Sequence, residues 1–172
     1  MAQWHMLTLV GTDRPGIVAE VTAALYQAGN NLGEASMIRL GGSFTIMLMI
    51  QGGSPGSLQT ALAPIAASMN LNIHVDPVAG GLHQHQAPNV QVRVFGADRA
   101  GIVAQVTGAL AATGFNILEL TSDVAGSAGK PVYILHIEGL TTHPVETLQA
   151  AIDGLGLRNL RVDVSPIETL IG

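Results

Sequence analysis

Residues 11–22 read Gly-Thr-Asp-Arg-Pro-Gly-Ile-Val-Ala-Glu-Val-Thr, and residues 96–107 read Gly-Ala-Asp-Arg-Ala-Gly-Ile-Val-Ala-Gln-Val-Thr. Gly96 lies 85 positions after Gly11 (96 minus 11), and about half of the positions from 11 to 38 are identical in the second copy. The same spacing relates three further pairs, Gly29 and Gly114, Asn31 and Asn116, and Glu34 and Glu119. The chain therefore consists of two related modules of roughly 80 residues, each long enough to carry its own core.

The first copy predicts the order strand, helix, strand, strand, helix, strand. Ile17, Val21 and Leu25 recur at helical spacing, and Gly29 stands where a helix commonly stops. The third strand is apolar almost throughout, which favours a central strand covered on both faces. Pro64 falls inside the second helix and is expected to kink or shorten it. The expected strands are 5–10, 32–40, 43–50 and 71–76, and the expected helices are 15–28 and 54–69.

The second copy repeats this order, with a longer glycine-rich loop expected over 125–130. Its expected strands are 90–94, 117–124, 132–138 and 160–165, and its expected helices are 102–113 and 144–155. The Gly and Pro content of 77–88 predicts a linker between a first domain, 1–76, and a second domain, 89–172. The predicted class is α+β, as two tandem ferredoxin-like βαββαβ domains with antiparallel sheets.

The composition restricts what such a chain can bind. Charged residues make up only 11% of the 172 residues, well below the usual quarter, so packing between the copies or between chains is expected. The formal net charge is −5 with only 7 Lys and Arg, which argues against direct binding to nucleic acid or to anionic lipid.

Cysteine is absent, so disulfides, thiol nucleophiles and thiolate metal sites are excluded. The amino-terminal residues lack the features of a signal peptide, and the longest apolar run, 44–50, is far too short to span a bilayer. A soluble cytoplasmic protein is the expectation.

No nucleophile elbow, P-loop or dinucleotide fingerprint is present, so the sequence predicts no enzyme and no cofactor. His83 and His85 lie in the linker without a carboxylate nearby and predict no metal site.

The Asp-Arg-x-Gly turn before the first helix of each copy is the candidate binding element. A turn at a helix start directs unpaired backbone N–H groups at one point, which suits a small carboxylate. Gly16 and Gly101 would let a ligand approach the backbone closely. Asp13 and Asp98 are compatible with two roles, helix capping or contact with a ligand ammonium.

Asn31 and Asn116 begin the second strand of each copy. An amide side chain has a donor and an acceptor and can meet both ends of a zwitterion. The alternative is that each asparagine only satisfies backbone groups of the preceding turn.

The strand, Asp-Arg-Pro-Gly, helix, Gly-x-Asn, strand pattern resembles the ACT domain, a regulatory amino-acid-binding module, and the resemblance covers nearly the whole chain twice. A tandem pair without an attached enzyme is similar to the glycine cleavage repressor group of that family. The family binds amino acids between the first loop of one domain and the second-strand region of its neighbour. Carried over by position, this implicates Gly11, Thr12, Asp13, Arg14, Pro15, Gly16 and Asn31, and Gly96, Asp98, Arg99, Gly101 and Asn116.

The copies differ where Ala100 replaces Pro15 and Phe115 replaces Asn30, which argues against equal affinity at the two sites. The resemblance implies a non-catalytic sensor of a small amino acid, glycine or serine, that regulates a partner protein in the transcription of glycine cleavage or one-carbon genes. Two alternatives stay open: a regulatory subunit acting in trans on a metabolic enzyme, and a dimerising module whose site is vestigial. A homodimer is compatible with each of them.

Overall fold

The computed structural model of the chain describes residues 3–78, 86–97, 100–127, 130–157 and 160–167, and these fall into two compact units, Met1–His83 and Gln84–Gly172. The first unit contains β1 (Trp4–Thr12), α1 (Ile17–Gln27), β2 (Asn31–Leu40), β3 (Ser43–Gln51), α2 (Pro55–Met69) and β4 (Asn72–Val78). The second contains β5 (Val90–Ala97), α3 (Ile102–Ala112), β6 (Asn116–Ser127), β7 (Lys130–Leu140), α4 (Val145–Asp153) and β8 (Leu160–Pro166).

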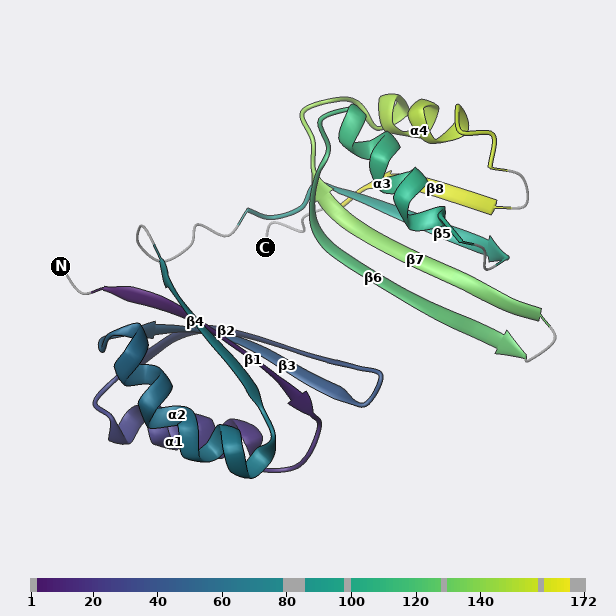
Figure 1. The fold of residues 1–172 in the computed structure, drawn as a ribbon. Helices are drawn as coiled ribbons and strands as arrows, with labels where there is room; N and C mark the ends of the chain where they lie inside the picture. Colours follow the sequence, from purple (N-terminus) through teal and green to yellow (C-terminus); the bar gives the residue numbers. More distant parts are fainter. Residues whose placement is uncertain (1–2, 79–85, 98–99, 128–129, 158–159, 168–172) are drawn as a thin grey trace. The chain divides into compact units, whose positions relative to one another are not determined.

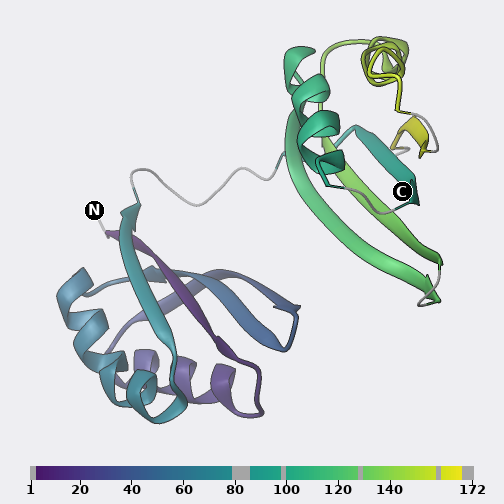
Figure 2. The same ribbon diagram turned by 45° about the vertical axis from the view of Figure 1, so that its right-hand side comes forward.

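Each unit is a four-stranded antiparallel sheet with two helices on one face (Figures 1 and 2). The strand order is β2-β3-β1-β4 in the first domain and β6-β7-β5-β8 in the second. This is the ferredoxin-like βαββαβ arrangement, so the prediction of two tandem domains of this class is confirmed. How the two sheets pack stays a prediction.

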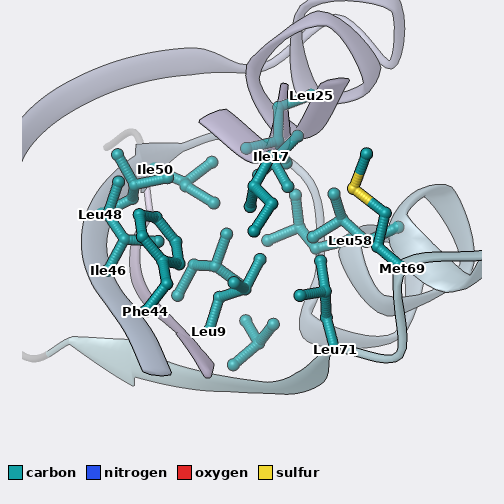
Figure 3. Packing of buried hydrophobic residues seen from close by; sticks show 14 residues of the cluster. Leu9, Ile17, Leu25, Phe44, Ile46, Leu48, Ile50, Leu58, Met69 and Leu71 are labelled. Atoms are coloured by element: carbon teal, nitrogen blue, oxygen red, sulfur yellow. The ribbon is translucent and has the colours of Figure 1, made fainter. Parts of the chain in front are cut away.

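The core of the first domain lies between its sheet and its helices. Strands β1 and β3 direct alternate side chains toward α1 and α2, and these side chains interdigitate with Ile17, Leu25 and Leu58 (Figure 3). Alternation places the intervening residues on the opposite face of the sheet, here called the open face. Strand β3 is central, as predicted, but it is not covered on both faces: Met47 on the open face is 44% exposed.

Glycines mark the ends of α1 and α3, and a serine pair marks the start of α2. Gly29 (φ 75°) and Gly114 (φ 76°) follow α1 and α3 in the left-handed backbone region, as the predicted stops require. The start of α2 carries a capping box, in which the Ser54 side chain and the Ser57 backbone N–H are 3.2 Å apart.

Helix α2 runs to Met69, as expected, with Pro64 inside it, so Pro64 does not shorten the helix and a kink at Pro64 stays a prediction. Two other predictions need correction. Strand β4 includes Pro77 and Val78, which pair with His5 and Trp4, so these two residues do not belong to the linker. The glycine-rich loop expected over 125–130 is mostly strand, because β6 and β7 stay in register as far as Ser127 and Lys130. Among the described residues, no helix is both long and apolar enough to cross a membrane.

Candidate functional site

The loop between β1 and α1 is attached to the turn of the β2–β3 hairpin. The backbone N–H of Asp13 donates to the carbonyl of Gly42 at 3.0 Å. The Asp13 carboxylate lies 2.5 Å from the Arg39 guanidinium on β2. Because both Asp13 contacts are made to the hairpin, the loop is held at one end of the sheet. The Asp13 carboxylate therefore already has a cationic partner.

Helix α1 begins without a side-chain cap. The N-cap residue is Gly16, at φ 93°, and the first helical hydrogen bond runs from Glu20 N–H to Gly16 C=O at 3.0 Å. The prediction that Asp13 caps this helix is therefore wrong. The amides before Glu20, those of Ile17, Val18 and Ala19, precede the first helical bond and point out of the helix start.

An open depression of about 620 Å³ lies in front of these amides. The residues that line it include the helix-start residues Ile17, Val18 and Ala19, the cationic Arg14 and Arg39, and the acidic Asp13. Its apolar part comes from Met37 and Phe44 of the hairpin. Donors and cations facing an apolar wall suit a small carboxylate-bearing ligand. The lining residues are Asp13, Arg14, Pro15, Gly16, Ile17, Val18, Ala19, Met37, Arg39 and Phe44.

Gly16 has room for a methyl group: a Cβ there would lie 3.9 Å from Glu20 Oε1, its nearest neighbour. The positive φ, rather than crowding, is what requires glycine at this position. Gly11 and Thr12 are the last residues of β1 and do not line the depression. A Cβ on Gly11 would lie 2.5 Å from the Leu71 side chain, so Gly11 is required for packing against Leu71.

Within one domain, the structure does not bring the asparagine to the loop. Asn31 pairs with Gln51, which pairs with Trp4 at the start of β1, whereas the loop follows Thr12 at the other end. Eight residues of strand separate the two ends, about 26 Å at the usual rise. The two halves of the predicted site, the loop and the asparagine, therefore lie at opposite ends of one domain. A ligand that touches both halves needs the second half from a neighbouring domain.

Asn30, and not Asn31, braces the turn after α1. Asn30 is 8% exposed, and its Nδ2 donates to the carbonyls of Leu25 at 3.2 Å and Ala28 at 3.3 Å. Asn31 and Asn116 are both exposed, and neither side chain has a hydrogen-bond partner in the described part of the chain. The interpretation that they satisfy turn backbone is therefore wrong.

The second domain repeats the helix start but changes the hairpin wall. Gly101 is the N-cap of α3 at φ 89°, and Gln105 N–H donates to Gly101 C=O at 2.9 Å. Gly96 lies in β5 and Asn116 begins β6, but Asp98 and Arg99 lie outside the described residues. The register places Ser122, Val124 and Tyr133 where the first domain has Met37, Arg39 and Phe44.

Sequence reasoning missed the hairpin residues of the first site, Met37, Arg39 and Phe44. The available signal was a single arginine inside the apolar second strand, and the strand order brings it next to the loop. No group of three His, Cys, Asp or Glu side chains that could hold a metal occurs among the described residues, and His83 and His85 lie outside them.

Two ACT-domain profiles match this chain, one over residues 5–76 and the other over residues 90–152. The chain belongs to the ACT-domain family. The first match spans most of β1 to most of β4, whereas the second starts with β5, ends within α4 and leaves out β8. Each match includes the loop and the asparagine of its domain.

Similar proteins share the tandem organisation. The glycine cleavage system transcriptional repressor of Escherichia coli is 26% identical over 148 residues, which cover 85% of this chain and 77% of that protein. A crystal structure of a protein of unknown function from Galdieria sulphuraria superposes with a TM-score of 0.74 at 25% identity, covering 98% of this chain and all of that one. The crystal structure of a candidate glycine cleavage repressor has the same fold, with a TM-score of 0.69 at 24% identity and coverage of 98% and 99%.

Proposed function

We propose that this tandem ACT protein is a non-catalytic regulatory sensor that binds a small amino acid at the Asp-Arg-x-Gly loops. The observation that carries the proposal is the uncapped helix start behind Gly16, which faces an open depression and recurs at Gly101. The likeness to a glycine cleavage repressor makes glycine, and then serine, the first ligands to test.

In the proposed binding mode, the carboxylate and the ammonium of one zwitterionic ligand contact two different domains. The ligand carboxylate accepts hydrogen bonds from the amides at the start of α1 or α3, where the helix dipole favours negative charge. The ligand ammonium needs an acceptor, which the paired Asp13 carboxylate supplies poorly because Arg39 already neutralises it. The exposed amide oxygen of Asn31 or Asn116, contributed by a neighbouring domain, fills that role.

Regulation in this proposal proceeds through protein contact. A ligand bound between two domains favours the arrangement that holds both halves of the site, and this population shift changes the surface offered to a partner. The net charge of −5 makes direct DNA contact unfavourable, so a transcriptional role would run through a DNA-binding partner protein.

Differential scanning fluorimetry against the twenty amino acids tests the proposal. A ligand selective for the native state at a hundred times its Kd stabilises by about 2.7 kcal/mol, which raises the Tm of a small domain by roughly 10 °C or more. Acetate and ethanolamine, each carrying one charged group of glycine, are the matched controls and should give much smaller shifts. If none of the twenty amino acids raises the Tm, the result would favour the alternative of a dimerising module whose site is vestigial.

A further inference from the structure

Three of the six methionines of the chain lie together on the open face of the first domain. Met6 on β1 pairs with Met49 on β3, and Met47, two residues before Met49, pairs with Thr8, so the three side chains point to the same side of the sheet. Directly opposed Cβ atoms lie about 4.5–5.5 Å apart and diagonal ones about 7–8 Å apart. Because the methionine side chain is long and flexible, three sulfur atoms at these spacings can meet at one point. We call Met6, Met47 and Met49 the methionine triangle.

The ring of Trp4 covers one side of the triangle. Trp4 lies two residues before Met6 and on the same face. A Cβ added to Gly33 of β2 would lie 2.8 Å from Trp4 Cζ3 and 3.2 Å from Met49 Cβ, so the indole reaches across β3 and is a neighbour of Met49. Met49 is only 8% exposed, although α1 and α2 lie on the other side of the sheet (Figures 1 and 2). Met47 is 44% exposed, so the triangle stays open to solvent at that corner.

The charges around the triangle favour a cation. Asp76 on β4 stands opposite Met6, and its Oδ1 lies 3.0 Å from Nε2 of His74. Residues 1–83 contain no lysine and only two arginines, Arg14 and Arg39. Both arginines line the depression at the start of α1. A cation at the triangle therefore meets a carboxylate nearby and no fixed positive charge beside it.

The second domain shows that the fold does not require these methionines. All six methionines of the chain occur in residues 1–69. On the same face of the second domain, the register places Gln91, His136 and Glu138 where the first domain has the triangle. The concentration of sulfur on this face is therefore a property of the first domain's sequence and not of the shared architecture.

We propose that the methionine triangle is a binding site for a soft monovalent metal ion of the Cu(I) class, held by three thioether sulfurs. Thioethers are soft ligands that select Cu(I), whereas carboxylates and water suit the hard divalent ions. The indole of Trp4 adds attraction for a cation over its face. The chain has no cysteine, so no thiolate competes for the ion. The triangle is separate from the depression at the start of α1, and the inference does not depend on amino-acid binding.

Methyl NMR of the full chain, labelled with ¹³C at the methionine methyl groups, tests the site with Ag(I), the redox-inert probe of this class, in chloride-free buffer. One equivalent of Ag(I) should shift the methyl signals of Met6, Met47 and Met49 together. Met37 is the matched control, because it is 54% exposed but lies on the helix side of β2. Cu(I) kept reduced with ascorbate should shift the same three signals.

Two outcomes of the methyl NMR would overturn the proposal. One is the absence of any shift with Ag(I) or with Cu(I). The other is a shift of Met37 equal to that of Met47, which would mean that the ion binds any exposed methionine.

Leucine variants measure the contribution of each sulfur through the emission of Trp4, the only tryptophan of the chain. Met6→Leu and Met47→Leu roughly keep the side-chain volume but remove the thioether, and each should weaken Ag(I) binding by at least about tenfold. Met37→Leu should bind like the wild type, and the Tm of each variant shows whether its fold is kept. Unchanged affinity in both Met6→Leu and Met47→Leu, or equal affinity of the wild type for Zn(II), would contradict a thioether site.

Discussion

At the scale of single residues, the two domains stabilise the turn after their first helix with different side chains. In the first domain Asn30 bonds to Leu25 C=O, whereas in the second Thr113 Oγ1 donates to Leu110 C=O at 2.6 Å. The position of Asn30 is then free to be Phe115 in the second domain, where it is 5% exposed. Its ring packs on Gly139, which stands where the first domain has Ile50. Phe115 is thus a change of packing and leaves Asn116 exposed.

Two neighbouring asparagines should therefore respond in opposite ways to alanine substitution. Asn30→Ala removes a buried brace and should destabilise the first domain by about 1–3 kcal/mol while ligand affinity is retained. Asn31→Ala should leave the Tm unchanged and weaken amino-acid binding about tenfold or more, the cost of one hydrogen bond to a charged group. Scanning calorimetry and titration calorimetry on both variants measure these effects. A lowered Tm with unchanged affinity in Asn31→Ala would remove Asn31 from the site.

Among the described residues of the first domain, His5 is the other buried polar side chain besides Asn30. It is fully buried, and neither ring nitrogen has a hydrogen-bond partner in the described part of the chain. The second domain has Val90 at this position, 3% exposed. Because an unpaired buried polar group costs about 1–3 kcal/mol, His5→Leu should raise the Tm of the first domain by roughly 4–8 °C per kcal/mol.

The reciprocal variant, Val90→His, should destabilise the second domain by a comparable amount. Scanning calorimetry of both variants measures the two effects. A loss of stability in His5→Leu would show that the imidazole has a stabilising partner, such as a buried water, and that the cost assigned to it is wrong.

At the scale of elements, the junction of β1 and α1 depends on backbone conformation. Gly16 and Gly101 adopt φ 93° and 89°, and this geometry leaves the first helical amides free. The Asp13–Arg39 pair ties the loop to β2, but the arginine is 68% exposed, and such pairs contribute little stability. The position of the loop therefore rests on the glycine and on the bond from Asp13 N–H to Gly42.

Gly16→Ala should destabilise the first domain by roughly 1–2 kcal/mol, because alanine is strained at positive φ although space for its Cβ exists. Gly56→Ala is the matched control: Gly56 lies in the first turn of α2 without a positive φ and with no atom within 4 Å of an added Cβ. It should be neutral or stabilising by up to about 1 kcal/mol. Equal Tm values for the two variants, measured by thermal unfolding, would refute the conformational role of Gly16.

The elements themselves could largely be predicted from the sequence, because the repeat presents each pattern twice and Gly29 and Gly114 mark the helix ends. The extension of β6 and β7 could not be predicted from the sequence. Glycine usually indicates a loop, but here the pairing of the two strands overrides that local preference. The motif predicted the loop residues Asp13 to Gly16, which line the depression and whose role in binding stays a prediction. The hairpin half could not be predicted, because Arg39 reaches Asp13 only through the strand order of the folded sheet.

At the scale of the whole molecule, the two domains share a fold but differ in their surfaces. The depression of the first domain has Arg39 beside it, and the corresponding position of the second is Val124. On the open face, Arg93 and Asp123 of the second domain stand where the first domain has Thr8 and Ile38. The two modules therefore have similar helix starts but different side chains around them.

The purified chain should not bind DNA specifically. Its 12 acidic residues exceed its 7 basic ones, and no basic run occurs in the sequence, so phosphate contacts would be few. A gel-shift assay at moderate salt, using promoter fragments of glycine cleavage genes, measures this. Sequence-specific retardation by the protein alone would overturn the mechanism by protein contact.

The most direct test of the central claim is a titration of the ¹⁵N-labelled chain with glycine and serine, followed by NMR. The account predicts shifts in the backbone amides of Gly16, Ile17 and Val18, in their counterparts behind Gly101, and in the side-chain amide of Asn31 or Asn116. These shifts should saturate together, because one ligand touches both halves of the site. A spectrum that either amino acid leaves unchanged, or that changes only at residues away from these loops, would contradict the account.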